Sequence, residues 1–156
     1  MSSVAFGLLL FVQAASLFQQ DFLIGSDGSG YYAVGRRNDT HIFHATTADA
    51  TINAAVGALG VHGGTIGLLP GRFELGAPIL IDRSSVTLAG ANAGGDLFFT
   101  PMNNHTQGFE NKWASILVAT GDFDAVQVGF AAAGEAQPLI FGVALHDIGA
   151  LYPYLI

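Results

Sequence analysis

Three acidic residues in the last third of the chain carry the strongest indication of chemistry. Asp122 and Asp124 are two positions apart, so both carboxylates would point to the same side of a strand. Two adjacent carboxylates suit an acid and base pair or a hard cation such as Ca²⁺. A turn, in which both accept hydrogen bonds from backbone amides, is the favoured alternative. Asp147 is the third catalytic candidate, but His146 and Asp147 would point to opposite faces of an extended strand, which argues against a His–Asp catalytic pair.

The other possible metal ligands do not have the spacing of a metal site. His41 and His44 are three positions apart, which places them on opposite faces of a strand, and no His-Glu-x-x-His helix accompanies them. The absence of Cys excludes Cys-ligated zinc, iron–sulfur clusters and thiol catalysis. We therefore assign no metal ligand, and Ca²⁺ at the paired carboxylates is the one cofactor considered.

A polar segment at residues 101–113 is the best candidate for ligand binding. It carries Trp113, Phe109 and His105 among several amide side chains. Loops on a rigid scaffold often bind ligands, and aromatic faces and amides suit the rings and hydroxyls of sugars. The alternative is that Trp113 packs against the scaffold and anchors the loop, because a lone Trp is usually buried.

The composition favours a single β-rich domain. The chain has 156 residues, of which 51% are hydrophobic and 11% are charged, with 21 Gly and many aromatic residues. That pattern indicates apolar strands joined by turns, and an all-β fold is expected. The net charge of −7 argues against the basic surface that nucleic-acid binding requires.

The chain divides into three parts by its hydropathy. Residues 1–20 form an apolar leader, which is either a secretory signal peptide or a first strand or helix that is retained. The leader is too short for a permanent membrane span. Residues 21–45 alternate apolar runs with Gly and Asp clusters and are expected to form three short strands. The glycines of residues 25–30 predict a β-turn rather than a phosphate-binding loop.

Residues 46–156 begin with one helix and continue as short apolar strands. Within residues 46–59, Ile52, Val56 and Leu59 follow a helical period. The strand-like segments after residue 64 lack the two-residue hairpin turns that antiparallel neighbours usually have, so parallel pairing is expected. Segments around Thr87, Leu117 and Val143 recur at loosely similar intervals, which is typical of a solenoid whose repeats stack on one another. A sandwich or barrel of hairpins is the alternative.

This part of the chain resembles the entry into the right-handed parallel β-helix of the pectate-lyase-like superfamily. The resemblance rests on an Ile-Asn-Ala-Ala helix, a Gly-Gly-Thr-Ile strand, a Leu-Pro-Gly-Arg-Phe turn and a Val-Thr-Leu-Ala-Gly strand, at residues 52–55, 63–66, 69–73 and 86–90. Residues 114–129 and 141–149 look like two further coils. The expected fold is therefore an all-β solenoid, the N-terminal portion of a parallel β-helix, with the helix covering its first open end and the unpaired strand edges there.

The resemblance implies a carbohydrate-active protein. Relatives bind polysaccharides, and some cleave them as lyases or hydrolases with acids on an exposed sheet of later coils, sometimes with calcium. Whether this chain is an enzyme stays open, and the isolated chain is expected to be inactive. The alternative is a non-catalytic structural segment, like an adhesin or tailspike shaft, which works in attachment or assembly. Either function implies secretion or cell-surface display. The apolar end at residues 151–156 favours further coils or a homo-oligomer.

Overall fold

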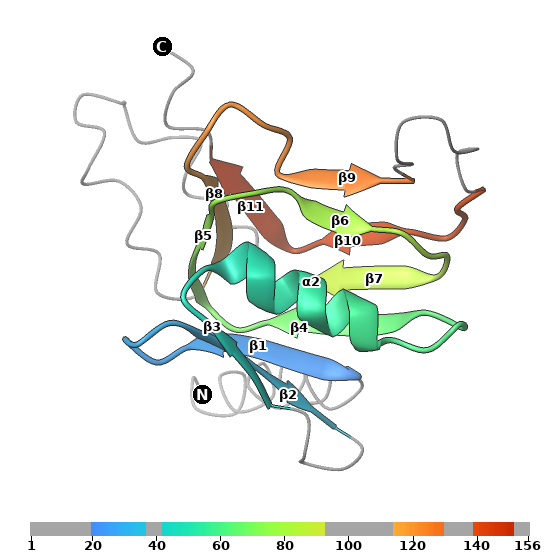
Figure 1. Cartoon of the computed structure of the whole chain (residues 1–156), viewed down its shortest axis with the longest axis horizontal. Helices are drawn as coiled ribbons and strands as arrows, with labels where there is room; N and C mark the ends of the chain where they lie inside the picture. The colour runs from blue at the N-terminus through green and yellow to red at the C-terminus, as the bar shows by residue number, and fades with distance from the viewer. Residues whose placement is uncertain (1–19, 37–41, 93–113, 130–138, 152–156) are drawn as a thin grey trace, which may run out of the picture.

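The computed structural model describes residues 20–36, 42–92, 114–129 and 139–151, which form three sheets and one helix (Figure 1). The largest sheet has the strand order β10-β7-β4-β1-β2-β3. Its strands are β1 (Phe22–Ser26), β2 (Tyr31–Gly35), β3 (Ile42–Ala45), β4 (Gly64–Leu68), β7 (Val86–Ala89) and β10 (Ala144–His146). The β1–β2 and β2–β3 pairs are antiparallel, whereas β1, β4, β7 and β10 pair in parallel.

The two smaller sheets are entirely parallel. One has the order β11-β8-β5 and the other pairs β6 with β9. Their strands are β5 (Gly71–Leu75), β8 (Ser115–Ala119), β11 (Ile148–Leu151), β6 (Ile79–Ile81) and β9 (Val126–Val128). Consecutive strands β4, β5 and β6 thus enter three different sheets, and β7, β8 and β9 pair onto them in the same order.

The expected all-β solenoid is wrong, because the described residues form a mixed α/β fold. The largest sheet is mixed: β1, β2 and β3 form an antiparallel meander that extends it at one edge. Helix α2 (Ala48–Ala58) belongs to the main core, where its Ile52 and Val56 are buried together with strand residues. The sequence pattern of short strands did not indicate that the first three would pair antiparallel within the same sheet as the parallel strands.

Several local expectations are confirmed within this fold. The helix expected at residues 46–59 is α2, and the three strands expected in residues 21–45 are β1, β2 and β3. Within the glycine-rich residues 25–30, Gly25 and Ser26 end β1, and residues 27–30 form the turn of the β1–β2 hairpin, with Gly28 at φ 81°. The strands after residue 64 pair in parallel, as the absence of short hairpin turns predicts.

The expected equivalence of the segments around Thr87, Leu117 and Val143 is wrong. Strand β7 pairs with β10 at Thr87 and Ala144, so the first and third segments do stack. Leu117 lies on β8, which pairs with Phe73 of β5 in a different sheet. Similar apolar triplets occur in all three sheets, so their spacing alone does not reveal which strands are neighbours.

The main core fills the space between the three sheets and α2. Burial alternates along β5, where Phe73 and Leu75 are buried and Arg72 and Glu74 are exposed, whereas all five residues of β8 are buried. The largest fully buried apolar side chains come from all three sheets and the helix: Phe73, Ile24, Ile52, Ile66, Leu68, Leu75, Ile79 and Ile81. Burying each of them stabilises the fold by roughly 1.5–3 kcal/mol relative to exposure. Within the described residues, no helix has the length and apolar character needed to cross a bilayer.

Candidate functional site

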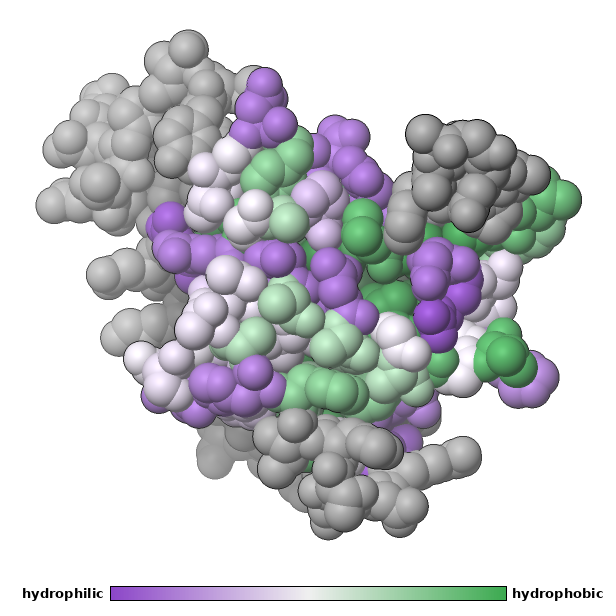
Figure 2. Space-filling view, in the orientation of Figure 1, coloured by the Kyte–Doolittle hydropathy of each residue, from purple (hydrophilic) through white to green (hydrophobic). Residues whose placement is uncertain are grey.

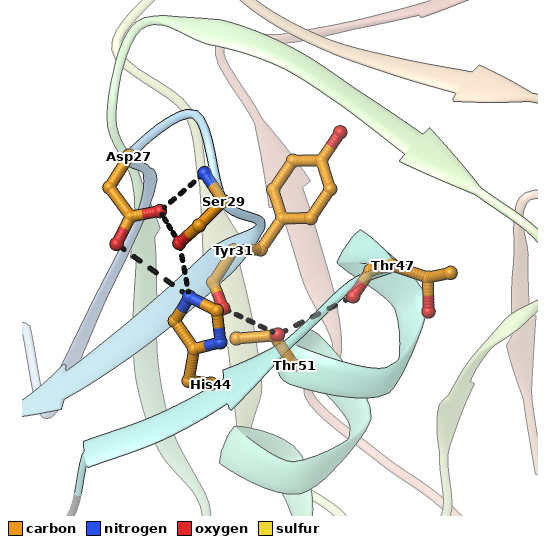
Figure 3. A network of polar contacts seen from close by, with 6 residues as sticks. All are labelled: Asp27, Ser29, Tyr31, His44, Thr47 and Thr51. Carbon is orange, nitrogen blue, oxygen red and sulfur yellow. Dashed lines mark hydrogen bonds and ion pairs between the residues drawn. The ribbon is translucent and has the colours of Figure 1, made fainter.

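An Asp, a Ser and a His meet at the tip of the β1–β2 hairpin (Figure 3). The hydroxyl of Ser29 donates to Oδ1 of Asp27 at 2.7 Å, and the backbone amide of Ser29 donates to the same oxygen at 3.0 Å. Nε2 of His44, from β3, lies 3.2 Å from the Ser29 hydroxyl oxygen and 3.6 Å from Oδ2 of Asp27. The antiparallel pairing of Tyr32 with His44 brings β3 alongside this hairpin.

The direction in which each hydrogen bond is donated excludes a nucleophilic role for Ser29 in this arrangement. A catalytic serine gives its proton to the histidine, and the acid holds the other ring nitrogen. Here the one Ser29 proton goes to Asp27, so His44 must donate to the Ser29 oxygen, and both partners contact the same histidine nitrogen. The three side chains are exposed, and the network ties the hairpin tip to β3.

The network has an electrostatic consequence for Asp27. The Ser29 hydroxyl and backbone amide, with a smaller contribution from His44, hold the pKa of the Asp27 carboxyl below its ordinary value. Hydrogen bonds to the ionised form of an acid stabilise that form. Asp27 is therefore an anion at neutral pH, and a carboxylate in this state accepts hydrogen bonds but does not act as an acid.

The catalytic candidates do not come together. Asp122 and Asp124 are exposed and lie in the connection between β8 and β9, as the turn interpretation predicts, rather than side by side on a strand. Asp147 lies between β10 and β11, in another connection. The expectation that His146 and Asp147 point apart is wrong: Nδ1 of His146 lies 2.9 Å from Oδ2 of Asp147. Asp147 has a φ of 57°, which interrupts the strand and turns its side chain toward the histidine.

The candidate ligand residues Trp113, Phe109 and His105 lie outside the described residues, as does His41. Among the residues that the structure describes, no group of three or more His, Asp or Glu side chains is placed to hold a metal ion. The pair at Asp122 and Asp124 supplies two carboxylates in an exposed turn, so calcium binding there stays a prediction.

One end of the sheet assembly is closed by side chains that act in place of a neighbouring strand. The amide group of Asn53 on α2 accepts from the Leu80 backbone amide at 2.8 Å and donates to the Pro78 carbonyl at 3.0 Å. Oδ1 of Asp49 accepts from the Gly76 amide at 2.8 Å. The Tyr31 hydroxyl accepts from the Glu74 amide at 3.0 Å. We call this the closed end: the edges of β5 and β6 that α2 and Tyr31 cover.

The other end is open. Strands β9, β10 and β11 are the last strands of their sheets on the side away from β1, β2 and β3, and no described strand pairs with their outer edges (Figure 1). Apolar side chains there are exposed: Val128 by 48%, Leu145 by 50%, Phe141 by 69% and Leu139 by 84%. We call these outer edges and four side chains the open end. Figure 2 shows hydrophobic residues in green at the upper right, where the chain leads into β10.

The exposed side chains of the open end extend the rows of buried core residues. Leu145 pairs in register with the buried Leu88, and Val128 pairs with the buried Ile81, so both follow the inward-facing rows of their sheets. Val143 and Ile148 already pack against the main core and are half-buried. The four exposed side chains of the open end are not predicted from the sequence, which places the uncovered apolar end at residues 151–156. The signal that could have found them is the run of apolar residues at 139–145, which is longer than one buried strand face needs.

No protein-family model, curated protein or solved structure matches this chain. Nothing therefore identifies it as a member of the pectate-lyase-like superfamily, and the function must be argued from the geometry of the described residues.

Proposed function

We propose that this chain is a structural module that docks onto another polypeptide through its open end. The observation that carries the proposal is the difference between the two ends of the sheets. At the closed end, Asn53 and Asp49 satisfy backbone groups of β5 and β6. At the open end, no described strand pairs with the outer edges of β9, β10 and β11, and apolar side chains are exposed beside them.

An open end of this kind favours binding of protein. Unpaired edge strands hydrogen-bond to additional strands, and contiguous exposed apolar residues mark interaction surfaces. We favour the attachment or assembly function over polysaccharide cleavage, because Asp122 and Asp124 lie exposed in one connection and Asp147 lies exposed in another. Polysaccharide binding at Trp113 and display outside the cell stay predictions that rest on residues outside the described part of the chain.

The native mass of the protein isolated gently from its source tests this function. We expect the wild-type chain in a complex heavier than one chain. Phe141→Ser should weaken that complex by roughly tenfold in Kd, because an exposed aromatic anchor is lost. Val61→Ser is the matched control, since Val61 is 90% exposed but lies between α2 and β4.

Two results would count against docking at the open end. The first is a wild-type protein that is monomeric when isolated at its natural concentration. The second is a complex that Phe141→Ser and Val61→Ser weaken equally, because that would place the contact elsewhere on the molecule.

A further inference from the structure

The open end offers a partner two kinds of contact at once. Among the residues that the structure describes, no strand pairs with the outer edges of β9, β10 and β11, and Leu145 and Val128 present apolar surface beside these edges. A polypeptide in extended conformation can satisfy both, because its backbone pairs with an edge and alternate side chains cover the apolar row. This makes a strand-forming segment the fitting occupant.

A second copy of the chain does not supply such a segment at its closed end. There the Gly76 and Leu80 amides already donate to Asp49 and Asn53, and the Glu74 amide donates to Tyr31. Two of the three sheets are therefore blocked to head-to-tail stacking. Self-association that uses the outer edges of all three sheets would place one open end against another, in a two-fold arrangement.

The charges at the open end oppose that two-fold arrangement. The described segments 114–129 and 139–151 contain Asp122, Asp124 and Asp147 and no Lys or Arg, and their one His, His146, lies 2.9 Å from Asp147. All three carboxylates are exposed, in the connections that lead into β9 and β11. Joining two open ends would bring acidic groups together, and the whole chain carries a net charge of −7. Juxtaposed like charges disfavour association.

We infer that the occupant of the open end is a different polypeptide, with an apolar strand-forming segment flanked by Lys or Arg. The inference rests on the proposed docking function and adds the chemistry of the partner. The apolar segment covers Leu145 and Val128, and the flanking cations face Asp122, Asp124 and Asp147. The acidic groups thus select the partner, and the strand edges hold it.

A pair of synthetic peptides tests the charge requirement. Both carry the sequence SSVTLAG of residues 84–90, which includes β7 and already pairs with β10 in the fold. One is flanked by Lys at both ends and the other by Glu. Fluorescence anisotropy with the full chain should give a Kd roughly tenfold lower for the Lys-flanked peptide at low salt, and the difference should shrink at about 0.5 M salt.

Matched variants locate the effect. Asp122→Asn with Asp124→Asn should remove most of the preference for the Lys-flanked peptide. Asp27→Asn with Glu74→Gln changes the charge by the same amount away from the open end and should retain the preference.

Other outcomes would overturn the inference and are separable from failure of the docking function. A homodimer in the native-mass experiment would make the occupant a second copy, while docking would stand. Equal binding of the two peptides, or no binding of either, would rule out the inferred partner with flanking Lys or Arg. A monomeric protein in its source would instead remove the docking function itself.

Discussion

At the residue scale, the local backbone conformation decides which partner each polar side chain reaches. Ser29 lies in the hairpin turn, where its hydroxyl reaches Asp27, so a Ser, a His and an Asp produce a structural network rather than a nucleophile. Asp147 illustrates the same dependence, because its φ of 57° brings its carboxylate to His146. Neither contact follows from residue spacing, since spacing assumes regular backbone.

Removing the Ser29 hydroxyl tests the origin of the Asp27 pKa. Ser29→Ala should raise the pKa of Asp27 toward its ordinary value, because the largest stabilising hydrogen bond is lost. In the wild type, the lowered pKa of Asp27 stabilises the folded state at pH values above the ordinary pKa of Asp. This stabilisation is lost as the pH falls through the lowered pKa of the folded state. NMR titration of the Asp27 carboxyl in the wild type and in Ser29→Ala measures the two pKa values. Ser26→Ala, at the end of β1, is the control, and an unchanged pKa in Ser29→Ala would show that another group holds the carboxylate.

At the element scale, the sequence predicts the kinds of element well and their partners less well. The helical period of Ile52 and Val56 and the apolar runs indicate α2 and most strands correctly. Within residues 141–149, which are expected to form one coil, the first strand begins only at Ala144, because Gly142 has a φ of 70°. The left-handed residues Gly63, Ser85 and Gly142 precede β4, β7 and β10 in turn. Only Gly favours this conformation strongly, so the equivalent position at Ser85 gives no clear signal.

The closing of β6 by α2 predicts a specific loss of stability. Asn53→Ala should lower the free energy of unfolding by about 1–3 kcal/mol, because the Leu80 amide and the Pro78 carbonyl lose their partner. Asn53→Asp keeps the acceptor for the Leu80 amide, so its free energy of unfolding should lie between those of the wild type and Asn53→Ala. Urea denaturation measures these differences.

Gly57→Ala, in the same helix, should change the free energy of unfolding in the opposite direction. A Cβ at Gly57 meets no atom within 4 Å, so the substitution should stabilise the fold by about 0.5–1 kcal/mol through helix propensity. Should Asn53→Ala prove neutral while Gly57→Ala stabilises, the bonds from Asn53 would not be needed to close the edge.

At the scale of the whole molecule, the two ends of the sheets differ in a way that composition does not reveal. The net charge of −7 is a property of the whole sequence, but the absence of Lys and Arg from segments 114–129 and 139–151 matters because these segments contain β9, β10 and β11, the last strands of their sheets. The apolar character was expected from the sequence, but its location on β9 and β10 depends on the order of strands in three sheets.

Hydrogen–deuterium exchange of the protein, alone and in its isolated complex, tests the open end most directly. In the complex, we expect amides of β9, β10 and β11 to gain protection as their outer edges pair, while the hairpin of β1 and β2 exchanges as before. Protection confined to the hairpin, or to the exposed face of β5 that carries Arg72 and Glu74, would contradict docking through the open end.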